Sequence, residues 1–321
     1  MKKTCALILA VLLLATAAAC GGSKPAPTSP PASPGTSTPS PDGGEGLTIT
    51  DMKGRTRTLE KPVERIVVLT AADCEILFAL GAGDKVVARG EYCDYPAEAL
   101  ELPAVSSGSE TNIEQIIALN PDVVIMSTMD QTLDQIESIE NAGIPVLTTN
   151  AQTIDGVYEA IAMIGQAVGR NQEAENLIQY MKDAFAELVA KVPQAEKKPT
   201  IYVEVSPLRY GLWAAGKGTF VNELAEMLGA ENIFADIDQW GEVSEEQVIQ
   251  RDPDFIVTTT MSFEGDPDPI EEILSRPGWS GIKAIANGKV FNADGYEIIR
   301  PGPRLVDAAR QLYDFLYGDA A

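Results

Sequence analysis

Short apolar runs alternate with segments of helical spacing along the chain after residue 47. Arg65–Thr70 and Val123–Met126 have apolar cores of the kind found in buried parallel strands. Cys74–Leu80 and Ile113–Leu119 have helical spacing, and the second of them ends at Asn120, immediately before a proline. Strands that alternate with helices indicate a parallel sheet covered by helices on both faces.

The same alternation continues through the rest of the chain. In the first half we expect a strand at Lys85–Ala88, a helix at Leu133–Asn141 and a strand that opens at Pro145. The alternation then restarts with Thr200–Val205, Val221–Leu228, Glu245–Gln250, Phe255–Thr259 and Ile270–Leu274, and a last helix is predicted at Arg304–Leu316.

One segment, Asn171–Val192, keeps helical apolar spacing over its whole length and contains no glycine or proline. At about 1.5 Å per residue, a helix of this length spans about 33 Å. Because the segment falls between the two copies of an internal repeat, we interpret it as a rigid connector helix.

That repeat consists of two patterns that occur twice in the same order. Glu75–Ala82 matches Glu223–Ala230, and Glu114–Ile125 matches Glu246–Val257, with the Glu, Gln, Pro and Asp of the second pair identical. The copies are too far apart for a solenoid, whose repeats have roughly 20–50 residues. We therefore expect an α/β fold with two pseudo-symmetric lobes, each with a parallel sheet, joined by the long connector helix, and a ligand cleft between the lobes. The expected boundaries are 47–170 for the N-terminal lobe, 171–192 for the connector and 193–321 for the C-terminal lobe.

The first 19 residues have the features of a secretion signal. After a basic start, Ala6–Ala15 is an apolar run too short for a membrane span, and Ala17–Ala19 forms a small-residue cleavage site. Cys20 follows directly and resembles the cysteine of the bacterial lipobox, which implies a lipid on Cys20. Residues 20–46 are rich in Pro, Ser, Thr and Gly, a composition that does not fold. We interpret them as a lipid-anchored tether that moors an extracytoplasmic protein to the cell membrane.

The charge of the chain excludes several classes of partner. Without Lys2 and Lys3, the 24 basic residues fall to 22, against 47 acidic residues, which gives a formal charge of −25. Such a charge argues against binding to nucleic acid and against docking on an anionic lipid surface. Contact with the membrane is therefore expected only through the N-terminal lipid.

The chain contains no histidine. This excludes Ser-His-Asp and Cys-His catalysis and zinc sites built on imidazole, and it disfavours a carrier of zinc or manganese. We predict no catalytic residue, no metal site and no cofactor. Beyond the leader and Cys20, the cysteines are Cys74 and Cys93, and the sequence leaves open whether they form a disulfide.

Four local motifs, spread over nearly the whole folded part, point to one family. They are Arg65–Leu69, Glu91–Pro96, the doubled Glu-Gln helix start and Arg300–Arg304. Together they resemble the class III substrate-binding proteins of ABC importers, which take up iron–siderophores, haem or cobalamin. The Tyr-x-Asp-Tyr-Pro stretch and Trp240–Gln247 are most similar to the cobalamin-binding branch. The resemblance implies a monomer without catalysis that carries a small metal-chelate ligand to a permease dimer with its ATPase.

Glu114 and Glu246 begin equivalent helices of the repeat. A carboxylate in the first turn is stabilised by the helix dipole by about 0.3–1 kcal/mol, and this alone can explain both residues. In the family that the chain resembles, one glutamate of each lobe docks on arginines of the paired permease subunits, and a pseudo-twofold protein needs one such contact on each half. We therefore predict that Glu114 and Glu246 dock on the permease, with Glu75 and Glu223 as a rival symmetric pair.

Aromatic side chains in loops are the candidate ligand contacts, because loops at the strand ends of an open α/β sheet line its ligand crevice and rings match a flat macrocycle. Arg300 has two interpretations, since it can pair with a ligand carboxylate or phosphate or with the protein's own acids. Gly108 and Ser127 stand where the cobalamin branch tends to have ring side chains, which implies a roomier cleft or a different corrinoid. The predicted ligand-binding residues are Tyr92, Tyr95, Tyr210, Trp213, Trp240, Tyr296 and Arg300.

We therefore expect a lipid-anchored binding protein that captures cobalamin or another corrinoid. An alternative within the class is a ferric siderophore or haem, with Tyr92 or Tyr95 as an oxygen ligand to iron. An alternative from another class is a surface hydrolase that uses paired carboxylates.

Overall fold

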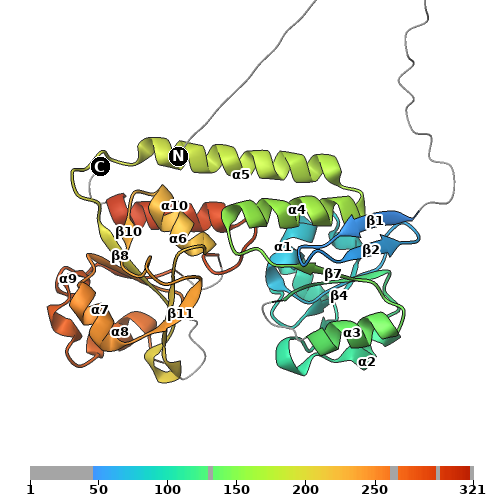
Figure 1. The fold of residues 1–321 in the computed structure, drawn as a ribbon, viewed down its shortest axis with the longest axis horizontal. Helices are drawn as coiled ribbons and strands as arrows, with labels where there is room; N and C mark the ends of the chain where they lie inside the picture. The colour runs from blue at the N-terminus through green and yellow to red at the C-terminus, as the bar shows by residue number, and fades with distance from the viewer. Residues whose placement is uncertain (1–45, 129–132, 261–266, 294–296, 319–321) are drawn as a thin grey trace, which may run out of the picture. The chain divides into compact units, whose positions relative to one another are not determined.

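The computed structural model describes residues 46–128, 133–260, 267–293 and 297–318 (Figure 1). The chain divides into two compact units, Met1–Gly44 and Glu45–Ala321, and the described residues belong to the second. The predicted leader, Cys20 and nearly all of the predicted tether lie outside the described residues. In the part of the chain that is described, no helix combines the length and the apolar composition needed to cross a membrane.

The first lobe is built on a five-stranded parallel sheet in the order β5-β4-β3-β6-β7. The strands β3, β6 and β7 are buried along their whole length, which confirms the prediction of buried parallel strands. The strands of this sheet are β3 (Ile66–Val68), β4 (Val86–Gly90), β5 (Ala104–Val105), β6 (Val123–Ser127) and β7 (Val146–Thr149).

Helices cover both faces of this sheet. Val68 packs in a core with α1 (Ala71–Ala79), whereas its neighbour Val67 packs in a second core with α2 (Ile113–Ala118) and α3 (Leu133–Asn141). Neighbouring strand residues therefore point to opposite faces, and both faces are apolar. The other elements of this lobe are the antiparallel hairpin β1 (Leu47–Thr50) and β2 (Thr56–Leu59) and the 3-10 helices η1 (Gly83–Lys85), η2 (Ala97–Glu101) and η3 (Gly108–Glu110).

The second lobe has a six-stranded sheet in the order β11-β9-β8-β12-β13, and β10 pairs with β8. Its central strands are parallel, as predicted, but β9 and β11 are antiparallel to their neighbours. Only residues 207–211 separate β8 from β9, and a parallel return needs a crossover of roughly a dozen residues or more. The strands are β8 (Thr200–Ser206), β9 (Leu212–Ala215), β10 (Glu231–Asn232), β11 (Trp240–Val243), β12 (Phe255–Thr258) and β13 (Val290–Asn292).

The predicted connector forms one continuous helix, α5, over Asn171–Lys191. It lies beside α4 (Ile154–Val168), which follows β7 of the first lobe, and beside α10 (Leu305–Tyr317), which ends the second lobe (Figure 1). The contact with α4 is close at Gly165, where a Cβ would lie 2.6 Å from the Cβ of Ala174. The remaining helices are α6 (Phe220–Met227), α7 (Glu245–Arg251), α8 (Pro269–Ser275), α9 (Lys283–Ala286), η4 (Leu208–Tyr210) and η5 (Trp279–Gly281).

The repeated sequence folds into repeated structure. Asn112 caps α2 and Ser244 caps α7, and each side chain accepts a hydrogen bond from the backbone N–H three residues further on. Asn120 and Asp252, at the ends of these helices, have positive φ angles of 46° and 45°. Asn and Asp adopt this conformation more readily than other non-glycine residues, so part of the repeat is explained by the start and end of one helix.

The last aspartate of each copy joins two strands. Asp122 accepts hydrogen bonds of 2.9 Å from the backbone N–H groups of Glu64 and Arg65, at the entry to β3. Asp254 accepts a hydrogen bond of 3.0 Å from the backbone N–H of Thr200, the first residue of β8. Each carboxylate therefore ties its own strand, β6 or β12, to the neighbouring first strand of the same lobe.

Candidate functional site

Four of the predicted ligand-binding aromatics are exposed near strand ends. Tyr92 and Tyr95 follow β4, and Tyr92 is 64% exposed. Tyr210, which ends η4 after β8, is 72% exposed, and Trp213 on β9 is also exposed. Rings that only fill a core are not exposed in this way, so these four are open to a ligand. A fifth candidate, Tyr296, lies outside the described residues.

Trp240 differs from these four because it is half-buried. The prediction that Trp213 and Trp240 lie in loops is wrong, since Trp213 lies within β9 and Trp240 begins β11. The pairing of β11 with β9 places it on the same face of the ribbon as Trp213. Its ring packs edge-on against Phe220 with 5.7 Å between ring centroids, and its indole N–H donates to Oε1 of Gln152 at 2.9 Å. Gln152 follows β7 of the first lobe and Phe220 begins α6 of the second, so Trp240 lies at a contact between the lobes.

A second contact between the lobes is centred on Glu75 of α1. Its buried carboxylate accepts hydrogen bonds from Arg304 at 2.7 and 3.0 Å and from Arg300 at 3.2 Å. Arg300 also donates to Asp94 at 2.5 Å and to the carbonyl of Tyr92 at 3.2 Å. Of the two interpretations of Arg300, the structure thus favours pairing with the protein's own acids.

Arg304 extends this cluster to the second exposed tyrosine. Its guanidinium lies 4.1 Å from the centroid of the Tyr95 ring, a cation–π contact, and it pairs with Glu297 at 3.3 Å. Two arginines of the second lobe therefore hold the loop that carries Tyr92 and Tyr95. Neither Asp94 nor Glu297 is among the predicted site residues, although Asp94 lies within the Glu91–Pro96 motif.

Two contacts between the lobes, those of Glu75 and of Glu223, are related by the repeat. Glu223 of α6 accepts a hydrogen bond of 2.7 Å from the backbone N–H of Ile154, the first residue of α4. Glu75 likewise meets Arg304, the N-cap residue of α10. Each repeated glutamate reaches the start of a long helix of the other lobe, where the helix dipole favours a carboxylate. Because both glutamates are engaged within the protein, the geometry disfavours them as a docking pair.

Glu114 and Glu246 occupy matching, exposed positions. Each is the second residue of its helix, α2 or α7. Ile117 and Ile249, three residues later and on the same helix face, are 41% and 39% exposed. Within the described part of the chain, neither glutamate has a cationic partner. Each lobe therefore presents a carboxylate beside an apolar side chain.

Cys74 and Cys93 are both buried and are not joined by a disulfide. The Cys93 thiol lies 3.9 Å from the carbonyl of Val68, to which it donates. The neighbouring Cys74 thiol and burial raise the pKa of Cys93, so it is held as a neutral thiol. The question that the sequence left open is therefore answered in favour of two separate thiols that fill the core behind the Tyr92 loop.

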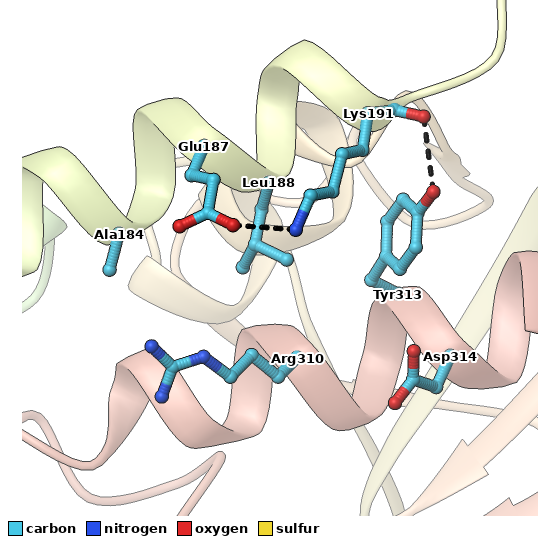
Figure 2. A pocket seen from close by; sticks show the side chains of 7 residues that line it. All are labelled: Ala184, Glu187, Leu188, Lys191, Arg310, Tyr313 and Asp314. Carbon is cyan, nitrogen blue, oxygen red and sulfur yellow. Dashed lines mark hydrogen bonds and ion pairs between the residues drawn. The ribbon is translucent and has the colours of Figure 1, made fainter.

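A cavity of about 240 Å³ lies between α5 and α10 (Figure 2). Lys191 pairs with Glu187 at 2.6 Å across its rim, and the Tyr313 hydroxyl donates to the carbonyl of Lys191 at 3.1 Å. None of the residues that line the cavity belongs to the loops that carry the exposed aromatics, so we assign no ligand to it. The lining residues are Ala184, Glu187, Leu188, Lys191, Arg310, Tyr313 and Asp314.

Comparisons with known proteins agree with this architecture. Residues 66–297 match the family described as periplasmic binding protein. The chain is similar to YvrC of Bacillus subtilis, an uncharacterized ABC transporter substrate-binding lipoprotein, with 34% identity over 278 residues that cover 85% of this chain and 86% of that protein. It is also 29% identical over 274 residues to a cobalamin-binding protein of Halobacterium salinarum, covering 83% of this chain and 73% of that protein.

The fold is also found among solved structures. The periplasmic haem-binding protein RhuT of Roseiflexus sp. RS-1, in its apo form, superposes with a TM-score of 0.72 and 26% sequence identity, covering 81% of this chain and 100% of that one. The matched residues 66–297 include the parallel strands of both lobes and the connector, and the family is one of binding proteins, so the hydrolase alternative is wrong. The chain therefore belongs to the periplasmic binding protein family, as the substrate-binding protein of an ABC importer.

Proposed function

We propose that this protein captures cobalamin or another corrinoid and delivers it to an ABC permease dimer with its ATPase. The observation that carries the ligand class is the set of exposed rings near strand ends: Tyr92, Tyr95, Tyr210 and Trp213. Such rings match a flat macrocycle, since each aromatic side chain buries about 150–250 Å². The relationship to a cobalamin-binding protein over most of the chain supports the same class. We further propose that the protein acts as a monomer without a cofactor of its own.

Cyanocobalamin is expected to quench the tryptophan fluorescence of the protein with a submicromolar dissociation constant, about −8 kcal/mol or better. Trp213 and Trp240 share one face of the β9–β11 ribbon, where the ligand is proposed to lie. Tyr92→Ala should weaken binding roughly three- to tenfold, because one stacked ring contributes about 0.5–1.5 kcal/mol. The measurement is a fluorescence titration checked by calorimetry.

Tyr180→Ala is the matched control for the ring substitution. Tyr180 is exposed to a similar degree but lies on α5, away from the proposed site, so its loss should leave the affinity unchanged. Equal weakening by Tyr180→Ala and Tyr92→Ala would mean that the Tyr92 ring has no specific role. Binding of a ferric siderophore but no corrinoid would overturn the corrinoid assignment.

Haem is the second candidate ligand. The similarity to RhuT favours it, and the exposed phenol groups of Tyr92 and Tyr95 offer oxygen ligands to ferric iron. The visible spectrum of protein purified from its native host separates the two candidates, because corrinoid and haem absorb at different wavelengths.

We propose that a lipid on Cys20 holds the protein outside the cytoplasm on the cell membrane, as the lipoprotein name of the Bacillus relative supports. Cys20→Ala is therefore expected to shift the protein from the membrane fraction to the soluble extracytoplasmic fraction, because one acyl-bearing cysteine is its proposed attachment. Immunoblots of separated fractions provide the measurement. A variant that stays in the membrane fraction contradicts the lipid anchor.

We also propose that Glu114 and Glu246 are the two points at which the permease dimer docks. Their matching positions on the two lobes suit a partner with twofold symmetry. The exposed Ile117 and Ile249 add an apolar contact next to each carboxylate. Each permease subunit then needs a cation next to an apolar patch.

A further inference from the structure

Arg300 and Arg304 pair with Glu75 at the contact between the lobes, which is called the Glu75 junction below. Both arginines are covered by carboxylates on two sides. The Glu75 side chain is 2% exposed and lies beneath Arg300, which is 10% exposed, whereas the Asp94 side chain is 36% exposed and lies on the outer side. Arg304 is arranged in the same way, between Glu75 and the more exposed Glu297. Among the described residues, two guanidinium groups thus face three carboxylates, and Arg300 makes a further interaction besides these.

This cluster adjoins the proposed ligand site. Arg300 donates to the Tyr92 carbonyl, and Arg304 lies against the Tyr95 ring. Guanidinium groups beside a ligand site are strong partners for ligand carboxylates, because the pairing is charge-assisted and can be bidentate. Here that capacity is already used: Asp94 contacts two nitrogens of Arg300, at 2.5 and 3.3 Å.

We infer that Asp94 and Glu297 set the ligand specificity of this protein by covering Arg300 and Arg304 and so excluding ligands that carry carboxylates. A carboxylate that approaches must displace Asp94 and meets the negative charges of Asp94 and Glu297. Cyanocobalamin has no free carboxylate, whereas haemin has two propionates. The inference rests on the proposed function to the extent that the ligand is placed at Tyr92 and Tyr95.

The inner and outer acids have different roles. Removal of the buried Glu75 would leave two largely buried arginines without their shared partner, so Glu75 is a structural residue. Asp94 and Glu297 are partly exposed, and their removal leaves each arginine paired with Glu75. The outer acids can therefore be replaced without opening the junction between the lobes.

Asp94→Asn should raise the affinity for haemin relative to cyanocobalamin by about tenfold, the effect of one additional charge-assisted hydrogen bond. Glu98→Gln is the matched control, since it makes the same change in net charge on an exposed residue of the adjoining segment. It should leave the ratio unchanged. The Asp94→Asn/Arg300→Gln double variant should lose the gain, because the guanidinium that Asp94 covers in the wild type is gone. Both affinities are measured by titration of the purified full chain.

Three outcomes overturn the inference. The first is an unchanged ratio in a folded Asp94→Asn variant, and the second is an equal rise with Glu98→Gln, which would reduce the effect to net charge. The third is tight haemin binding by the wild type, which shows that the outer acids exclude nothing. Glu297→Gln provides an independent variant at Arg304, with the same expected direction. Failure of the wild type to bind cyanocobalamin counts against the proposed ligand. The increase in haemin affinity of Asp94→Asn over the wild type tests the role of Asp94 separately.

Discussion

A Glu114→Ala/Glu246→Ala double variant is expected to abolish uptake through the importer while its affinity for the ligand stays unchanged. Both carboxylates are exposed at helix starts and lack a cationic partner in the described part of the chain, so their removal breaks nothing inside the protein. Charge contacts at an interface chiefly set encounter rate and register, so the loss should appear in transport and in complex formation with the permease. Each single variant should be milder, because the other lobe remains docked.

The control for this experiment uses the same symmetry. Glu137 on α3 and Glu271 on α8 are exposed glutamates, one on each lobe, so Glu137→Ala/Glu271→Ala makes the same change in charge on helices other than α2 and α7. This control should transport normally. Full uptake by the Glu114/Glu246 variant would refute the docking assignment, and a matching loss of ligand affinity would show that the two glutamates serve the binding site instead.

Local pattern predicted most of the secondary structure but missed α4. Some of the elements that it predicted, such as Leu133–Asn141, have one apolar face, and others, such as Val123–Met126, are continuous apolar runs. Helix α4 packs against α1 on one side and α5 on the other, and its exposed positions Asp155, Glu159, Ala162 and Gln166 keep helical spacing, so its pattern was readable in the sequence. Gly156 in its first turn lowers the helical preference. Gly165 further weakens the helical pattern, and its reason is tertiary: the close approach of Ala174.

The candidate site was predictable where a residue's role is local and not where it depends on contacts between lobes. The exposed Tyr92 and Tyr210 follow strands, and their placement in loops could be read from the sequence. The pairing of Glu75 with Arg300 and Arg304 joins residues more than two hundred positions apart, and no periodicity encodes it. The repeat did identify Glu75 as a candidate docking residue. Only the structure shows that Glu75 pairs with arginines of the other lobe instead.

Trp240 shows the same limit. Trp240 lies six residues before Glu246, and Gly108 lies six residues before Glu114, upstream of the repeated segment in each lobe. In the structure, Trp240 lies on the antiparallel strand β11, whereas Gly108 begins the 3-10 helix η3. The lobes therefore share the helices α2 and α7 but differ in the segments that lead into them, and the sequence repeat alone does not reveal this asymmetry.

Asp73→Asn is expected to stabilise the protein at pH 8 and to have little effect at pH 4. Asp73 is buried on α1, and burial raises its pKa to about 7, although hydrogen bonds from Thr149 and Thr70 offset part of the increase. An aspartate in the unfolded chain has a pKa of about 3.9. Between this pKa and the folded-state pKa, the folded state holds a proton that the unfolded state has lost. The free energy of unfolding therefore falls as pH rises through this range. At about 1.4 kcal/mol per pKa unit, the wild type loses roughly 4 kcal/mol by pH 8, a loss that the neutral amide side chain of the variant avoids.

Asp51 is the matched control with the opposite sign. It is also buried, which pushes its pKa upward, but hydrogen bonds from Thr148 at 2.6 Å and Arg55 at 2.7 Å outweigh burial and hold the pKa below its ordinary value. Its contribution to stability is present at neutral pH and is lost as pH falls through the lowered pKa. Asp51→Asn should therefore destabilise the protein at pH 7 and less at pH 3. Urea unfolding between pH 3 and pH 8 measures the free energy of unfolding of both variants and of the wild type. If the effects of the two substitutions changed with pH in the same direction, hydrogen-bond partners would not determine the charge state of these two buried carboxyls.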